Sequence, residues 1–488
     1  MKIALQQTLK QPLPYVSGPS DYMEFRALLE QIDRLLVTSK IEEQFITAAV
    51  EKNNTYGDNQ KRLEFLYRSL RTMILVTLTG NSCREMARRT ADSELFRWFI
   101  GINDIDRIKS PSKSTIKRME KIWSVEDIEA LVHKLNALVS DPSQSSLLLN
   151  SEKPVAIDEV FVDSTCISAN IHYPVDWLLI RDAVRTLTAS IILIRRQGIK
   201  HRMPEPLTLV TTMNTLAMEM TQCSRNRKGK NVRKRVFRKM KSHLKMVVRH
   251  AERYHKLLEK HSHITEWSEK QVQQVLERMK KVIEQVSSII KLAHTRIISE
   301  KKIPNAEKVL SLYEENVHVI KRGKFGADVE FGNGFYLAEQ RDGLIIDFDY
   351  FKEYPPADSD ILKESAKRIK CRYQIKLVAG DRAFNTKRND RYLAEENIFN
   401  ATCPKNPEEL SIKIDDERFR YAQKRRAQTE GRIGIFKNKF IGAKLQRKGY
   451  ENRALKMVWT VFTHNLWIIA RLAISNGKQQ SEAPPLAA

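Results

Sequence analysis

Three carboxylates in this chain lie where their types and surroundings suit chemistry on phosphate esters. Asp163 sits at the polar end of the apolar run "VFVDST", and Asp381 follows the apolar run in "IKLVAGDRAF". Glu430 is the single acid in "RRAQTEGRIGIFKNKF" (425–440), a segment with five basic side chains. Basic runs are usually solvated helix faces with a compensating ion pair, so Glu430 alone predicts no site.

The three acids together predict a metal site. Cleavage of a phosphodiester by two divalent ions needs several carboxylates that hold the ions roughly 3.5–4 Å apart. Mg²⁺ prefers oxygen ligands and keeps several waters, so three protein carboxylates suffice. The basic neighbours of Glu430 would bind the flanking phosphates. We therefore expect two Mg²⁺ ions, with Mn²⁺ as a possible substitute.

Two of the acids are expected on strands and the third on a helix. In open α/β sheets ligands gather at the carboxyl ends of strands, so Asp163 and Asp381 should share one rim. Asp158 is an alternative first acid; Asp163 is preferred because "DST" closes the apolar run. Glu430 should lie on a helix, although Gly431 and Gly434 each weaken that helix by about 1 kcal/mol relative to Ala.

These segments resemble the DDE transposases of bacterial insertion sequences. On a helix Arg426, Glu430 and Lys437 share one face, and this R-x3-E-x6-K spacing is similar to the motif around the last acid of those enzymes. "GDRAF" (380–384) resembles the segment around their second Asp. "VDSTCISANIHYPVDWLLIRDAVRTL" (162–187) and "RGKFGADVEFG" (322–332) resemble the group often called ISNCY. Related enzymes often carry Tyr three residues before the Arg, where this chain has Gln423.

The resemblance covers roughly residues 60 to 475. It implies an RNase H-like catalytic core, which is a mixed sheet flanked by helices, with Asp163, Asp381 and Glu430 as the catalytic and metal-binding triad. It also implies Mg²⁺-dependent cutting and joining of double-stranded DNA at the terminal inverted repeats and the target. A homodimer assembled on DNA follows from the resemblance as well.

The charge of the chain favours the same partner. Its 488 residues hold 84 Lys and Arg against 59 Asp and Glu, a net charge of +25, which points to nucleic acid. The expected DNA contacts fall in three places along the chain. They are Arg426, Arg432 and Lys437 beside the last acid, Lys117 and Arg118 near a helix start, and Arg233, Lys234 and Arg235 in a dense basic run.

Four further residues lie close in sequence to the first two acids. His172 and Asp176 would shape the site or form a structural turn, and Arg382 directly follows Asp381. Trp177 would stack on an unpaired base or, beside "LLI", belong to a core.

Other classes of protein fit poorly. The five cysteines are widely spaced and form no C-x-x-C pair, which argues against a zinc site or a disulfide framework. The N-terminus lacks the apolar run of a signal peptide. The apolar stretch 457–474 is interrupted by His464, Asn465 and Arg471, so a buried helix is expected rather than a membrane span. We expect a cytoplasmic, nucleoid-associated bacterial protein without a membrane partner.

Hydrophobic periodicity divides the chain into six parts. A flexible start (1–20) precedes an all-α DNA-binding domain of helix-turn-helix type (21–150), with one helix beginning near Pro111 and Ser114. The RNase H-like core is expected in two pieces, 151–200 and 319–474, separated by a helical insertion (201–318) that carries the basic run. Within this scheme Gly332-Asn333-Gly334 predicts a hairpin turn, two apolar stripes predict an antiparallel helix pair joined near "HSH" (261–263), and 475–488 is expected to be disordered.

Two rival functions share many of these features. A decayed or domesticated transposase would keep the fold and charge as a DNA-binding protein without catalysis. An RNase H-like nuclease would keep the triad but not join strands. The presence of all three acids favours an active enzyme.

Overall fold

The computed structural model describes residues 12–13, 17–53, 59–102, 108–224, 229–324 and 327–482. The chain forms two compact units: one combines the residues up to Ser168 with those from Asn333 onward, and the other is Ala169–Gly332. The second unit therefore begins earlier than the insertion predicted for 201–318. The reason is α9 (Asp176–Arg196), whose apolar side chains Ile180, Val184, Leu187 and Ile191 pack into the core of the second unit rather than onto the sheet.

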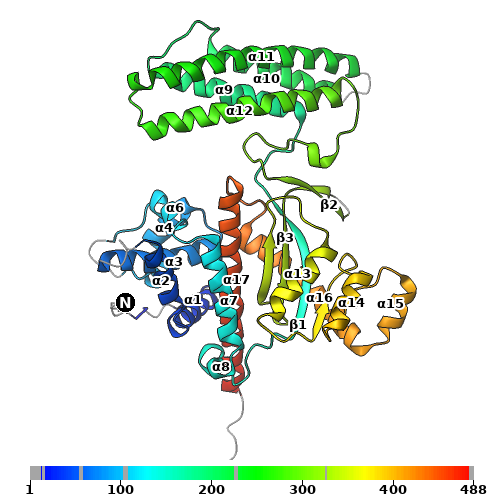
Figure 1. Cartoon of the computed structure of the whole chain (residues 1–488). Helices are drawn as coiled ribbons and strands as arrows, with labels where there is room; N and C mark the ends of the chain where they lie inside the picture. Colours follow the sequence, from blue (N-terminus) through cyan, green and yellow to red (C-terminus); the bar gives the residue numbers. More distant parts are fainter. Residues whose placement is uncertain are drawn as a thin grey trace, which may run out of the picture. The chain divides into compact units, whose positions relative to one another are not determined.

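A long C-terminal helix organises the first unit. This helix, α17 (Tyr450–Glu482), lies among α1 (Ser20–Thr38), α2 (Ile41–Lys52), α3 (Gln60–Thr79), α7 (Val125–Ser140) and α8 (Pro142–Leu149) (Figure 1). It is long and apolar enough to cross a membrane, but 83% of its most apolar window is buried inside the protein, which confirms the predicted core helix.

The end of α17 corrects one expectation. The helix continues past residue 475 to Glu482, so the disorder predicted for 475–488 is wrong for these residues; those beyond 482 lie outside the described ranges. Polar contacts hold the end of the helix: Asn150 Nδ2 donates to the Ala473 carbonyl at 3.1 Å, and Asn476 Nδ2 donates to that of Leu149 at 2.9 Å.

Three short helices form the segment predicted as a helix-turn-helix. They are α4 (Cys83–Asp92), α5 (Glu94–Ile100) and α6 (Lys113–Met119), and α6 packs on α3 and α4. The side chain of Ser112 caps α6 by accepting the Thr115 N–H at 3.2 Å, which confirms the predicted helix start. DNA recognition by this segment stays a prediction.

Among the described residues the sheet has six strands and is mixed. Its order is β2 (His318–Lys324), β3 (Ala327–Glu339), β1 (Glu159–Ser168), β5 (Leu377–Ala379) and β6 (Phe399–Asn400), with β4 (Ile345–Tyr350) also on β3. The pairs β1–β5 and β5–β6 are parallel, whereas β2–β3 and β3–β4 are antiparallel. A mixed sheet flanked by helices is therefore confirmed.

One turn was predicted in the wrong place. β3 runs unbroken through Gly332-Asn333-Gly334, and the chain turns instead between Gln340 and Leu344. Gly334 serves close packing: a Cβ there would lie 2.8 Å from the Cβ of Pro355.

Helices cover both faces of the sheet. Val160 and Val162 of β1 belong to the same core as Ile361 and Leu362 of α13 (Asp358–Lys370). The next residue, Phe161, points the other way, toward Phe419 and Ala422 of α16 (Glu417–Ile435). A π-helical segment, Phe436–Ile441, continues α16. Helices α14 (Lys387–Glu395) and α15 (Pro407–Ile414) lie between these two in sequence.

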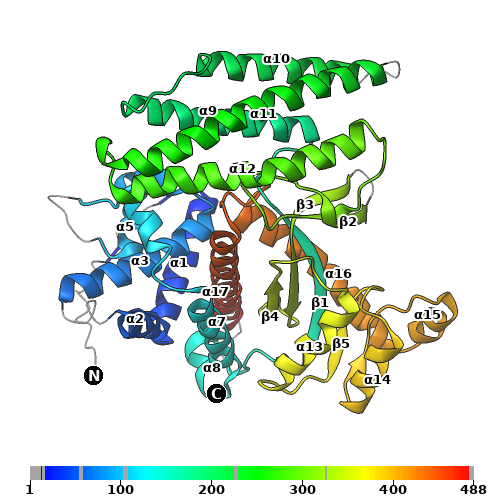
Figure 2. The same cartoon turned by 45° about the horizontal axis from the view of Figure 1, so that its top comes forward.

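The second unit contains a four-helix bundle. Besides α9 it comprises α10 (Pro206–Ser224), α11 (Lys230–His261) and α12 (Glu269–Ile297), which lie side by side (Figure 2). The 3-10 turn Ser262–Ile264 joins α11 to α12, so the predicted antiparallel pair and its link at "HSH" are confirmed. A second 3-10 turn, Asn305–Glu307, precedes β2.

Candidate active site

The strand register brings the first two acids side by side. Parallel pairing of β1 with β5 places Val160 opposite Val378 and Phe161 opposite Ala379. β5 ends at Ala379, and the same register continued by two residues would place Asp163 opposite Asp381, where paired strands are about 4.8 Å apart. The chains are still close at the intervening position, because a Cβ on Gly380 would lie 2.9 Å from Cγ2 of Val162.

The alternation of side chains along β1 decides which face of the sheet Asp163 lies on. Side chains two apart on a strand point to the same face, so Asp163 follows Phe161. Phe161 packs with Phe419 and Ala422 of α16. Asp163 therefore faces the helix that carries Glu430.

Asp163 does not end its strand, contrary to the sequence prediction. β1 continues to Ser168 because Cys166 and Ile167 are apolar and buried. The alternative acid Asp158 precedes β1 and forms an ion pair with Lys376 at 3.2 Å. It lies roughly 16 Å along the chain from Asp163 at 3.3 Å per residue, which supports the choice of Asp163.

Contacts along α16 fix its position on β1. Tyr421 Oη donates to Glu159 Oε2 at 2.9 Å, and the guanidinium of Arg425 lies 4.6 Å from the centre of the Phe161 ring. Further on, Lys437 Nζ donates to the Cys166 carbonyl at 2.8 Å. The helix therefore runs alongside the strand in the same direction, and Glu430 falls between these contacts, beside Asp163.

The electrostatics of Asp163 report the same grouping. The pKa of Asp163 is raised to about 6, chiefly by burial and also by the negative charges of Asp381 and Glu430. The Ser164 N–H, which donates to Asp163 Oδ1 at 2.7 Å, and the charge of Arg426 act in the opposite direction. The two other acids thus lie close enough for their charges to act on Asp163.

The three acids lie near one another but do not form a closed set of ligands. Asp381 Oδ1 accepts the Ala383 N–H at 2.8 Å. Glu430 is 59% exposed, and its Oε1 accepts Arg426 Nη1 at 3.4 Å. Across the described ranges, no three Asp, Glu, His or Cys side chains form a group that could hold a metal ion. By donor type the three carboxylates fit Mg²⁺, and a bound cation would relieve their mutual repulsion.

The Gln that replaces the expected Tyr also holds α16 in place. Gln423 Nε2 donates to the carbonyls of Ala401 at 2.5 Å and Gly380 at 3.3 Å. These carbonyls follow β6 and β5, respectively. Gln423 therefore links the helix of Glu430 to the strand end that precedes Asp381.

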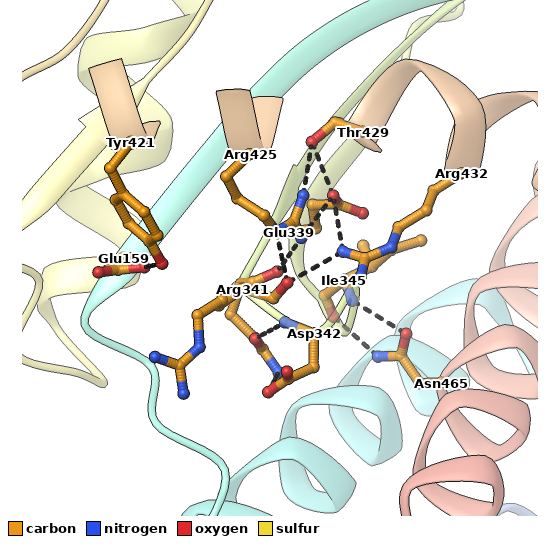
Figure 3. Close-up of polar contacts among 11 residues, drawn as sticks. Glu159, Glu339, Arg341, Asp342, Ile345, Tyr421, Arg425, Thr429, Arg432 and Asn465 are labelled. Atoms are coloured by element: carbon orange, nitrogen blue, oxygen red, sulfur yellow. Dashed lines mark hydrogen bonds and ion pairs between the residues drawn. The ribbon is translucent and has the colours of Figure 1, made fainter. Parts of the chain in front are cut away.

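The sequence analysis did not predict a cluster of buried ion pairs between α16 and the end of β3 (Figure 3). Glu339, at the end of β3, is 2% exposed, and its Oε1 accepts Thr429 Oγ1 at 2.7 Å. The same oxygen accepts Arg425 Nη2 and Arg432 Nη1, each at 3.2 Å. Because these partners are about ninety residues from Glu339 in sequence, no local pattern predicts the cluster.

Two of the predicted DNA contacts have other partners. Arg432 donates to Glu339 and, at 3.1 Å, to the Arg341 carbonyl. Lys437 is half-buried against β1 and donates to the Cys166 carbonyl. These contacts tie α16 and its continuation to the sheet, and a role of either side chain on DNA stays a prediction.

The four other residues that lie close in sequence to the first two acids belong to different units of the structure. Arg382 is exposed directly after Asp381. His172, Asp176 and Trp177 belong to the second unit, where Asp176 pairs with Arg296 at 2.9 Å and Trp177 Nε1 donates to Thr221 Oγ1 at 3.2 Å. The core interpretation of Trp177 is therefore confirmed, while His172 is exposed.

The other predicted DNA contacts are spread over α6 and α11. Lys117 and Arg118 are exposed on α6. On α11, Arg233 is half-buried, Lys234 pairs with Glu300 at 2.9 Å, and Arg235 is exposed.

A fourth acid near the triad was not predicted. Asp358 opens α13, its carboxylate is hydrogen-bonded to the side chain of Ser164, and burial raises its pKa, as does the charge of Asp381 to a lesser extent. An Asp at a helix start is so common that the sequence alone does not distinguish it from an ordinary first-turn acid.

Comparisons with protein-family models, curated proteins and solved structures found no match to this chain. The resemblance of the sequence segments therefore stays a prediction, and the function is argued from the site.

Proposed function

We propose that this protein is a DDE transposase that binds the terminal inverted repeats of an insertion sequence, cuts the DNA there and joins the freed end to target DNA. The observation that carries the proposal is the placement of Asp163, Asp381 and Glu430. Asp163 lies on β1, Asp381 lies two residues past the end of β5, which pairs with β1 in parallel, and Glu430 lies on the helix that packs on Phe161 of β1. One acid on a strand, one just after a neighbouring parallel strand and one on a covering helix are also the arrangement expected of an RNase H-like core.

The proposed cofactor is Mg²⁺, and Mn²⁺ is expected to substitute for it in the assay. Asp163, Asp381 and Glu430 would hold the ions, and two bound ions would stabilise both the attacking and the leaving oxygen of the phosphodiester. Arg426 orients Glu430 through their contact at 3.4 Å. The exposed Arg382 would bind a phosphate of the substrate next to Asp381.

The rest of the chain would bind and align the DNA. The helices around α6 would read the repeats with Lys117 and Arg118, and the excess of positive charge would hold the duplex. We propose that two copies act together on two DNA ends and that the protein works in the bacterial cytoplasm, associated with the nucleoid.

A cleavage assay tests the proposal. Purified protein is incubated with labelled duplexes carrying the inverted repeats that flank its gene, with Mg²⁺ or Mn²⁺ or with a chelator. Metal-dependent cuts at the repeat boundary are expected, together with joined products. Asp163→Asn, Asp381→Asn and Glu430→Gln should each reduce cutting by at least about 100-fold, because each removes a metal ligand.

The controls separate the rival functions. Glu353→Gln changes an exposed acid outside the site and should cut like the wild type. Cut products without joined products would indicate a nuclease, and binding without cutting in the wild type would indicate a DNA-binding protein that lacks catalysis. Equal cutting by the wild type and the triad variants would refute the proposed site.

A further inference from the structure

Helix α11 has an unusual charge balance. Its 32 residues contain twelve Lys and Arg but only two acids, Glu252 and Glu259. Its neutral side chains Phe237, Leu244 and Tyr254 are fully buried in the bundle. The charged side chains must therefore share what remains of the helix surface.

Most of these cations form a single stripe. At 100° per residue, eight of them fall within a sector of about 120° that contains neither acid. All eight are exposed, and we call them the basic stripe: Arg235, Arg238, Lys239, Lys245, Arg249, Arg253, Lys256 and Lys260. Lys234, which the sequence analysis had singled out, lies outside it and pairs with Glu300.

Acidic side chains in the part of the protein that the structure describes do not neutralise the charge of the basic stripe. Within the described ranges, only Arg235 pairs with an acid, Glu219, at 3.8 Å. Neighbours four residues apart, such as Lys245 and Arg249, repel each other and destabilise the helix. On the adjacent α12, by contrast, the exposed acids Glu269, Glu277 and Glu284 lie among the exposed cations. A helix face that bears only one sign of charge is suited to an external polyanion.

The length and chemistry of the stripe indicate which polyanion it fits. From Arg235 to Lys260 the helix rises about 37 Å, close to the roughly 34 Å of one turn of B-DNA. Lys and Arg contact phosphates, and no exposed aromatic side chain in the stripe is available to stack on bases.

We infer that the basic stripe binds the phosphate backbone of duplex DNA without regard to sequence. This inference rests on the proposed action on DNA and adds a second contact surface, distinct from the helices proposed to read the repeats. The second unit would thus hold DNA that lies outside the repeat.

The test uses the full-length protein in a chelator, so that no cutting occurs. A fluorescent 30-base-pair duplex of random sequence is titrated with protein at several salt concentrations. The variant K239Q/K245Q/K256Q removes three stripe charges. The slope of log K against log[salt] is negative, and its magnitude should decrease by about 2.7, because each lost phosphate contact contributes about 0.9.

The matched control K270Q/K280Q/K291Q removes three exposed lysines from α12 and the same net charge. Its slope and affinity should stay close to those of the wild type, whereas the stripe variant should bind roughly tenfold more weakly or worse at 0.1 M salt. Equal behaviour of the two variants would overturn the stripe but leave the proposed function untouched. Stripe-dependent binding to anionic vesicles of phosphatidylserine, without binding to DNA, would also overturn it. A wild type that binds no DNA under any salt condition would overturn both proposals.

Discussion

At the scale of single residues, the acids that face the site were predictable and the residues behind them were not. Asp163, Asp381 and Glu430 stand out only as a set, because two acids after apolar runs and a third within a basic run together suit a metal site on a phosphate ester. Glu339 follows the apolar stretch "FYLA" and resembles any strand-ending acid. Its role depends on Arg425 and Arg432, which reach it only when α16 packs against the sheet.

Removing the charge of Glu339 should be costly. Glu339→Gln leaves Arg425, which is 6% exposed, without a carboxylate partner. We expect a loss of about 3–5 kcal/mol in the free energy of unfolding, the usual cost of breaking a buried ion pair. Chemical denaturation followed by circular dichroism measures it.

An exposed acid provides the matched control. Glu451 pairs with Lys352 at 3.1 Å but is 78% exposed. Glu451→Gln should change stability by less than about 1 kcal/mol. If the two variants lose the same stability, the Glu339 cluster is not a structural support for α16.

At the scale of elements, the periodicity of apolar residues predicted most helices, whereas the glycines did not show where a strand or helix ends. The apolar stripes of α11 and α12 and the capped start of α6 were predicted because each is a local pattern. Gly332 and Gly334 were interpreted as a turn, but the strand continues because Gly334 allows the close approach of Pro355. Gly431 and Gly434 do not stop α16, since packing on β1 outweighs their low helix propensity.

Replacing Gly431 should stabilise α16. A Cβ at this position meets no atom within 4 Å, and alanine loses less conformational entropy on folding. Gly431→Ala should therefore raise the free energy of unfolding by about 0.4–1 kcal/mol, with cutting activity retained. A loss of stability in thermal denaturation would mean that the helix is not regular at Glu430.

Gly380 should respond in the opposite sense. A Cβ there would lie 2.9 Å from Val162 Cγ2 and 3.0 Å from the Phe384 ring. Gly380→Ala must therefore separate β1 from the segment that carries Asp381, and we expect a destabilised protein with cutting reduced by about 100-fold, as for a misplacement of about 1 Å. Wild-type cutting by this variant would show that the spacing of the two acids does not matter.

At the scale of the whole molecule, the two units have separate cores that composition does not reveal. The large core of the first unit unites helices from both ends of the chain around α17, and the bundle of the second unit has its own core. The boundary was predicted too late because α9 is as apolar as a helix that covers a sheet. The helices that α9 packs against, α10 to α12, are known only from the three-dimensional structure.

A buried lysine in α17 makes the stability of the first unit depend on pH. Burial, assisted by the charge of Arg447 and opposed by Glu120 and Cys83, lowers the pKa of Lys456 to about 7, and its Nζ donates to Thr77 Oγ1 at 3.0 Å. In the unfolded chain the pKa of this lysine is about 10.4. Burial of the charged lysine therefore destabilises the folded protein fully below pH 7, progressively less between pH 7 and pH 10.4, and not at all above pH 10.4.

Lys456→Met should remove this dependence. The variant should be more stable than the wild type by about 1–4 kcal/mol at pH 6, and the difference should shrink as the pH rises from 7 to 10. Thermal denaturation across this range measures it. A difference that does not change with pH would show that Lys456 keeps its ordinary pKa in the folded protein.

The most direct test of the central claim is the binding of Mn²⁺, followed by electron paramagnetic resonance, to the protein with a duplex that ends in the inverted repeat. The account predicts protein-bound Mn²⁺ that is lost or strongly weakened in Asp163→Asn, Asp381→Asn and Glu430→Gln and retained in Glu353→Gln. Mn²⁺ binding that is the same in all five proteins would contradict the assignment of the three acids as a metal site.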